Sequence, residues 1–305
     1  MGGCLGLMLL TANGCGDDKE KHCRYPLDPA HQEGETVECV DLKVPNRWDN
    51  PNGSTMNLHL AVFRADPEAP TPRAWLWLLG GPGQSWATST EIFSPEVIQN
   101  IGQDLIILDQ RGVGFNSPKL DCSDTKVPDQ SSIQTYIEKC VEDLRREGVV
   151  IEGYTTWEMA RDIEAARTQF GYESLDLLGV SYGTRLALEY LRLFPKTSHT
   201  VALDSVWPPQ YRLFETSLVA RNEAVDELFA ACDGDDQCQE DFPDLETQFE
   251  SVYSELEAKP LGMDDDSMDG DSFVGLLVST ILSFYPPVAP AVIYEMAEAI
   301  EKSQE

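Results

Sequence analysis

Ser181 lies at the centre of the segment Gly179-Val180-Ser181-Tyr182-Gly183, with a glycine two residues to either side. An apolar run at 175–178 precedes this segment, and a helical pattern at 182–194 follows it at once. A strand, a sharp turn and a helix in this order hold a serine hydroxyl exposed above a sheet, and the tight turn leaves room only for glycine at the flanking positions. The arrangement predicts that Ser181 is a nucleophile, whereas the pentapeptide alone would also suit an ordinary glycine-rich turn.

Three further loops follow apolar runs that are typical of strands. The runs at 74–79, 104–108 and 201–203 lead into Gly80-Gly81-Pro82-Gly83, Asp109-Gln110-Arg111-Gly112 and Asp204. Helical patterns separate the runs, so the alternation predicts an α/β fold with a mostly parallel sheet and helices on both faces. Because the carboxyl ends of such strands meet at one edge of the sheet, we expect these loops to lie beside Ser181.

An antiparallel hairpin is predicted at the edge of this sheet. The segments 36–44 and 56–63 alternate apolar and polar residues on either side of the turn residues 51–53. His59 lies in the second segment, and we expect it to be a solvated or packed strand residue without a catalytic role.

Gly80 and Gly81 let the backbone approach a substrate closely, because neither residue carries a side chain. The amides of Gly81 and Tyr182 are therefore candidates for an oxyanion hole, with Pro82 and Gly83 as supporting residues of the same loop. The alternative is a tight turn between a strand and a helix that binds no ligand.

Asp109 and Arg111 are the charged residues of the loop after the second run. We expect them to hold neighbouring loops through hydrogen bonds and an ion pair, and not to take part in the chemistry. Asp204 ends the strand at 201–203, at the correct edge of the sheet for a catalytic acid, but it ranks low among the candidates for that role.

The motifs at 80–83, 109–112 and 179–184, in this order, resemble those of the prolyl and tripeptidyl aminopeptidases, a family of α/β-hydrolases with secreted bacterial members. The resemblance runs from about Val37 to the C-terminus, and Leu79 stands where the prolyl aminopeptidases have histidine. It implies a serine exopeptidase that releases residues from peptide N-termini, with peptides as partners and no cofactor. It also implies a helical cap inserted after the sixth strand, which predicts a core at 36–206 and a cap at 207–305.

A serine nucleophile needs a histidine that accepts its proton and an acid that orients the histidine, and in this fold the chain order is serine, acid, histidine. Only His199 follows Ser181, and because it precedes the strand at 201–203, about 15 Å separates it from the edge that carries Ser181. The resemblance places the acid on a later strand than Asp204. We therefore expect the N-terminal part of a peptidase, with an incomplete sheet and cap, which lacks its acid and histidine and is inactive by itself.

Two other functions are compatible with the same residues. A nucleophile elbow does not distinguish ester from amide substrates, so a carboxylesterase is the alternative among the hydrolases. A non-catalytic peptide-binding protein is the alternative outside them.

The charge of the chain excludes several classes of partner. Its 22 Lys and Arg stand against 53 Asp and Glu, and the formal charge of −31 repels nucleic-acid phosphates and anionic membrane surfaces. The acidic segment 264–271 resembles a calcium loop, but Leu276 occupies the position of the required bidentate glutamate. We therefore expect a solvated loop, no metal and no nucleic acid, and the oligomeric state stays open.

The N-terminus has the pattern of an export signal. An apolar run at 5–10 is followed by a small residue and Cys15, as in bacterial lipoproteins, although no Lys or Arg precedes the run. We expect a signal at 1–15, lipidation of Cys15 and a polar tether at 16–35. The protein would then be exported, either secreted or attached to the membrane only through its lipid.

Six cysteines remain after this signal, and six allow fifteen pairings. Proximity in the sequence favours three disulfides, as expected in an oxidising compartment. These pairs are Cys23–Cys39, Cys122–Cys140 and Cys232–Cys238. A zinc site is the rival interpretation, but the chain has no C-x-x-C pair and no histidine at ligand spacing.

Overall fold

The computed structural model describes residues 23–69, 71–128, 132–262 and 267–304. The chain divides into two compact units, Met1–Gln210 and Tyr211–Glu305. Residues 207–210, which the sequence analysis assigns to the cap, belong to the first unit. The amide of Trp207 donates a hydrogen bond to Thr184 Oγ1 at 2.8 Å, and its ring packs edge-on against Tyr182 with the ring centroids 5.8 Å apart.

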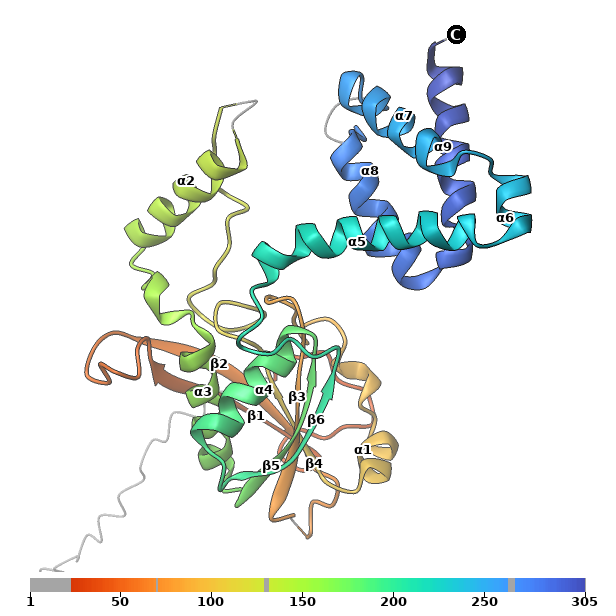
Figure 1. The fold of residues 1–305 in the computed structure, drawn as a ribbon. Helices are drawn as coiled ribbons and strands as arrows, with labels where there is room; N and C mark the ends of the chain where they lie inside the picture. Colours follow the sequence, from red (N-terminus) through yellow and green to blue (C-terminus); the bar gives the residue numbers. More distant parts are fainter. Residues whose placement is uncertain (1–22, 70, 129–131, 263–266, 305) are drawn as a thin grey trace, which may run out of the picture. The chain divides into compact units, whose positions relative to one another are not determined.

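The first unit contains a six-stranded mixed sheet in the order β1-β2-β4-β3-β5-β6 (Figure 1). The strands are β1 (Val37–Pro45), β2 (Thr55–Phe63), β3 (Arg73–Leu78), β4 (Asp104–Leu108), β5 (Ser174–Val180) and β6 (Ser198–Asp204). β1 and β2 form the predicted antiparallel hairpin, β2 pairs antiparallel with β4, and the other four strands are parallel. The α/β prediction with a mostly parallel sheet is therefore confirmed.

Alternate side chains of the central strands enter two different cores, one on each face of the sheet. In β4, Ile106 and Leu108 pack in one core, and Leu105 and Ile107 pack in the other. Successive side chains of a strand point to opposite faces, so a continuous apolar run can fill both cores. The helices α3 and α4 contribute to the first core and α1 to the second, which places helices on both faces as predicted (Figure 1).

Among the described residues, four α-helices belong to the first unit. They are α1 (Pro95–Ile101), α2 (Ile133–Arg146), α3 (Thr156–Phe170) and α4 (Tyr182–Leu193). At the start of α3, Thr155 Oγ1 accepts from the Glu158 amide at 3.3 Å, and Gly171 follows its last residue with a φ of 77°. The carboxylate of Glu158 accepts from the amide of Trp48 at 2.7 Å.

The second unit is helical. It contains α5 (Leu213–Asp233), α6 (Asp236–Asp241), α7 (Leu245–Ala258), α8 (Gly270–Leu276) and α9 (Ala289–Gln304). Its own core includes Leu228, Val252, Phe273 and Ile293, which are at most 8% exposed. The acidic residues 264–266, which form part of the predicted solvated loop, lie outside the described residues.

The described residues contain three disulfides, Cys23–Cys39, Cys122–Cys140 and Cys232–Cys238. They are the three pairs predicted from proximity, and they fit export to an oxidising compartment. The predicted signal and Cys15 lie outside the described residues. Within the described part of the chain, no helix combines the length and the apolar character that crossing a membrane requires.

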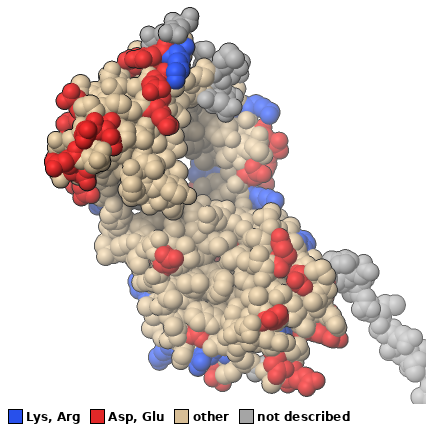
Figure 2. All heavy atoms as spheres, turned by 90° about the vertical axis from the view of Figure 1, so that its right-hand side faces the viewer, with Lys and Arg blue, Asp and Glu red and all other residues tan. Residues whose placement is uncertain are grey.

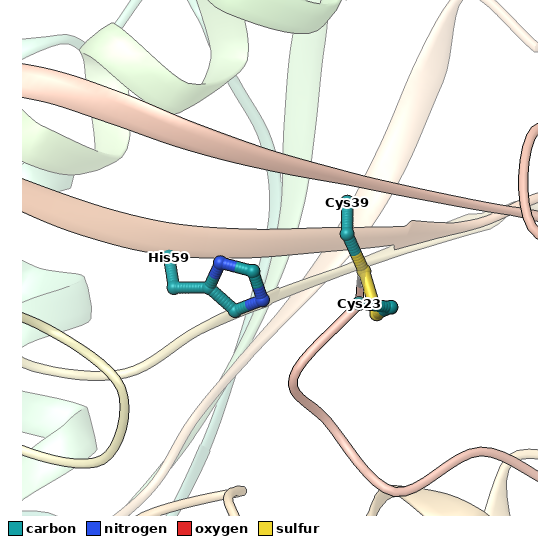
Figure 3. A group of neighbouring side chains, drawn as sticks. All are labelled: Cys23, Cys39 and His59. Carbon is teal, nitrogen blue, oxygen red and sulfur yellow. A yellow bond between two sulfur atoms is a disulfide. The ribbon is translucent and has the colours of Figure 1, made fainter. Parts of the chain in front are cut away.

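The segment from Cys23 onward, part of the predicted polar tether at 16–35, lies against the sheet. Tyr25 is 2% exposed and its hydroxyl donates to the carbonyl of His59 at 2.9 Å. Potential ligand atoms of Cys23, Cys39 and His59 lie within 4.8 Å of one another (Figure 3). Because the two sulfurs are bonded to each other, neither is a thiolate, and the group is a disulfide beside a histidine ring.

Acidification is expected to destabilise the first unit through His59. Burial lowers the pKa of this imidazole below its ordinary value of 6.5. Below about pH 6.5, the unfolded chain therefore binds a proton that the folded chain excludes, and the free energy of unfolding falls as the pH falls. The free energy of unfolding, measured with urea, should fall less steeply with falling pH for His59→Gln than for the native chain. Above pH 7 the two plots of this free energy against pH should be parallel. Identical slopes of the two plots below pH 6.5 would contradict this prediction.

Candidate active site

Ser181 forms the turn between β5 and α4, at the end of the strand that leads into it. Its backbone has φ 54° and ψ −119°, a conformation that is rare for a residue with a side chain, and the residue is exposed. Its amide donates to the carbonyl of Asp204 at 2.9 Å, and its carbonyl accepts from Thr184 Oγ1 at 2.6 Å. The strand, strained serine and helix that the motif requires are thus present.

The glycines that flank Ser181 are required by close backbone packing. A Cβ atom at Gly179 would lie 2.6 Å from the carbonyl oxygen of Gly183. One at Gly183 would lie 2.0 Å from the carbonyl oxygen of Leu78, at the end of β3. No other residue type fits at these positions without a backbone shift, so the two glycines hold α4 close against β3 and β5.

The loop after β3 passes directly beside Ser181. A Cβ atom at Gly80 would lie 3.0 Å from Ser181 Cβ and 3.4 Å from its Oγ. Gln110, in the loop after β4, donates from Nε2 to the carbonyls of Leu79 at 3.1 Å and Gly80 at 3.3 Å, and its Oε1 accepts from the amide of Gly83 at 3.3 Å. Gln110 therefore holds this loop, a role that the sequence analysis did not assign to it.

The amides of Gly81 and Tyr182 were predicted to form an oxyanion hole. Tyr182 is the first residue of α4, where an amide has no acceptor within the helix, and Gly81 has a φ of 99° in an exposed turn with Pro82 and Gly83. Neither amide donates a hydrogen bond to a protein group within the described residues. Both are thus available to a ligand oxygen.

Asp109 ties the loop after β4 to the loop after β3. Its carboxylate accepts from the Trp86 amide at 2.7 Å and from Ser85 Oγ at 2.8 Å, and Tyr25 Oη lies 3.5 Å from it. Asp109 is 3% exposed, and this burial raises the pKa of its carboxyl group. A Cβ atom at Gly114 would lie 1.9 Å from its Oδ2, so only glycine leaves room for this carboxylate.

Arg111 forms a buried ion pair with Asp162 of α3. Its Nε and one terminal nitrogen donate to the two carboxylate oxygens at 2.5 and 2.7 Å. The same guanidinium donates to three backbone carbonyls, those of Pro45, Asn46 and Gly153. All of these contacts lie inside the protein, so Arg111 joins β1, α3 and the loop after β4 and has no exposed group with which to bind a substrate.

Comparison with known proteins decides the family of this scaffold. A family described as "alpha/beta hydrolase fold" matches residues 78–233, which run from the last residue of β3 through β4, β5 and β6 and include the turn at Ser181. The chain belongs to the α/β hydrolase fold family.

The tripeptidyl aminopeptidase of Streptomyces lividans is 27% identical to this α/β hydrolase over 206 residues, and the match covers 57% of this chain and 36% of the relative. The serine protease Hip1 of Mycobacterium bovis is 25% identical over 200 residues, and the match covers 59% of this chain and 38% of the relative. This chain thus spans less than two fifths of the length of these two relatives. An α/β hydrolase fold protein from Chitinophaga pinensis is 16% identical, with a TM-score of 0.38, and the match covers 64% of this chain and 54% of that one.

His31, His59 and His199, the histidines that the structure describes, have partners other than Ser181. His199 lies near the start of β6, five residues before Asp204, and its Nδ1 is 2.7 Å from Asp176 Oδ1. His59 Nδ1 is 2.8 Å from Asp41 Oδ1, and His31 contacts Thr36 and the carbonyl of Phe93. Within the described residues, no histidine is hydrogen-bonded to Ser181.

Asp204, the low-ranking candidate for the acid, ends β6 at the edge of the sheet that carries Ser181. It is exposed, and its carboxylate accepts a hydrogen bond from Ser205 Oγ at 3.1 Å. Its carbonyl, and not its carboxylate, contacts the Ser181 amide. The arrangement presents an exposed serine beside two amides that have no protein acceptor, and no acid–histidine pair adjoins them in the described part of the chain.

Proposed function

We propose that this chain carries the nucleophile and the oxyanion hole of a serine peptidase that releases residues from the N-termini of peptides. The observation that carries the proposal is the exposed Ser181, which is held at a strained φ between β5 and α4 with Gly80 directly beside it. The relatives named tripeptidyl aminopeptidase and serine protease support a peptide as the substrate.

The chemistry follows from the positions of these atoms. Ser181 Oγ attacks the carbonyl carbon of the substrate and transfers its proton to a histidine. The negative charge that develops on the carbonyl oxygen is stabilised by the amides of Gly81 and Tyr182. The peptide amine then leaves with a proton, and water hydrolyses the acyl-enzyme in a second step.

We further propose that the histidine and its orienting acid come from outside these 305 residues. The support is the engagement of His199 with Asp176 at the start of β6, away from Ser181. The 305-residue chain alone is therefore expected to show no burst of acylation with an activated substrate. A burst from this chain would overturn this part of the proposal.

Replacing Ser181 by alanine is expected to lower the kcat/KM of the full-length gene product for aminoacyl substrates by about 10⁴-fold or more. Labelling by a fluorophosphonate should also disappear, because the probe reacts with an activated serine. The matched control is Ser205→Ala, which changes another exposed serine at the same edge of the sheet. This variant should retain both the native kcat/KM and the labelling by the fluorophosphonate. Unchanged turnover in Ser181→Ala would exclude Ser181 as the nucleophile.

Assays with chromogenic substrates and peptides distinguish the aminopeptidase from the two alternatives, a carboxylesterase and a peptide-binding protein. Turnover of acyl esters without turnover of aminoacyl substrates by the full-length product would favour a carboxylesterase. A peptide-binding protein predicts peptide affinity that survives Ser181→Ala and no labelling of the native protein.

Export is the second part of the proposal, and the three disulfides support it. Attachment to the membrane through a lipid on Cys15 stays a prediction. Mass spectrometry of the N-terminus of the native protein tests it, and an intact Met1 would contradict both signal cleavage and lipidation.

A further inference from the structure

The second unit contains a groove of about 460 Å³ between α5, α7 and α8. Each helix contributes residues three or four positions apart, which share one helix face. From α7 these residues are Glu246, Phe249, Glu250 and Tyr253. The groove therefore lies where the faces of three helices meet, and its volume is that of a site for a ligand or a peptide side chain.

The floor of the groove is apolar and partly aromatic. Val225 is buried, and Phe229, Phe249 and Val274 are half-buried around it. The rings of Phe229 and Phe249 pack edge to face with their centroids 5.5 Å apart. Apolar surface that remains accessible in a groove is stabilised when an apolar side chain of a ligand covers it.

The rim of the groove is acidic. Asp226, Glu246, Glu250 and Asp271 are exposed along it, and Arg221 is the one basic residue of the lining. Asp271 accepts from the Tyr253 hydroxyl at 3.2 Å. Asp226, Glu246 and Glu250 form no ion pair with any side chain that the structure describes, so their charges are available to a cationic partner.

The negative charge of the second unit favours a partner with basic side chains. Residues 211–305 contain 23 Asp and Glu against four Lys and Arg, and acidic side chains recur over the face in Figure 2. A second copy of this chain would be repelled, and a purely apolar partner would leave the rim carboxylates desolvated without compensation. A peptide that presents basic side chains beside apolar ones satisfies both the rim and the floor, and its cations can also interact with the aromatic faces.

We propose that this groove binds a peptide segment in which Lys or Arg alternates with large apolar residues. The inference does not rest on the nucleophile at Ser181, because the groove and its charges belong entirely to the second unit.

Fluorescence anisotropy with the intact 305-residue chain tests the proposal. The probe is a short, labelled peptide of alternating Leu and Lys, and its acetylated N-terminus prevents recognition through a free amine. We expect saturable binding that weakens as salt is raised. Glu246→Gln combined with Glu250→Gln should weaken it about tenfold, because two exposed charge pairs are lost.

The matched control is Glu240→Gln with Glu295→Gln, which removes two exposed acids of the same unit outside the groove. It changes the net charge equally and should leave the affinity within about twofold, since these charges lie outside the groove lining. Phe249→Ala should also weaken binding, and circular dichroism checks that the variant is folded. Equal losses in both double variants, equal binding of the same peptide with acetylated lysines, or no binding of the Lys peptide would each overturn the proposal.

Discussion

Replacing Arg111 by methionine is expected to lower the free energy of unfolding by about 3–5 kcal/mol, because it leaves the Asp162 carboxylate buried without its partner. The two side chains are 0% and 3% exposed, so water cannot replace the guanidinium. The substitution also removes the donors to three backbone carbonyls, those of Pro45, Asn46 and Gly153. Urea unfolding followed by circular dichroism measures the change.

An ion pair whose arginine is exposed provides the control for Arg111. Arg192 is 62% exposed and lies 2.7 Å from Glu189, so Arg192→Met should cost less than about 1 kcal/mol. Adding Asp162→Asn to Arg111→Met should destabilise less than the sum of the single changes, because the unpaired charge is removed together with its partner. A loss below about 1 kcal/mol for Arg111→Met would show that the ion pair does not hold β1, α3 and the loop after β4 together.

Replacing Gly183 by alanine is expected to lower the free energy of unfolding by about 3 kcal/mol. The new Cβ atom would lie 2.0 Å from the carbonyl oxygen of Leu78, which belongs to a central strand and cannot move without disturbing the sheet. The helix α4 must therefore shift away from β3, and Ser181 moves with it. Thermal unfolding measures the loss of stability, and fluorophosphonate labelling of the full-length gene product measures the displacement of the serine.

Gly275→Ala is the matched substitution, because a Cβ atom there has no neighbour within 4 Å. It lies inside α8, where alanine favours the helix by up to about 1 kcal/mol over glycine, so a small gain in stability is expected. Equal free energies of unfolding for Gly183→Ala and Gly275→Ala would contradict the prediction. They would show that the close packing of α4 on β3 does not require a glycine at position 183.

Much of the scaffold could be predicted from local sequence patterns. Buried parallel strands are short apolar runs, and the turn at Ser181 needs a glycine on either side, so both leave a signal within a few residues. The three disulfides close short loops, and their pairing followed from proximity alone. The bounds of α3 were predictable because its first and last turns are fixed by Thr155 and Gly171.

The supporting contacts of the site were not predictable in this way. Tyr25 lies in a segment that is polar on average, yet its hydroxyl lies 3.5 Å from the carboxylate of Asp109, 84 residues later. Arg111 meets Asp162 across 51 residues, and the charge of Arg111 alone could not identify which of many acidic residues it contacts. The groove of the second unit likewise combines faces of three helices that are separate in the sequence.

The sequence by itself determined the order of strands and helices, the candidate nucleophile and the sheet edge on which the loops meet, because these depend on hydrophobic periodicity and local backbone conformation. The tertiary structure alone decided which charged and polar side chains are partners. Such pairs depend on the packing of distant elements, and a buried charge is stable only beside the partner that this packing supplies. That is why Arg111, Asp109 and Gln110 support the loops around Ser181 through contacts that no local pattern records.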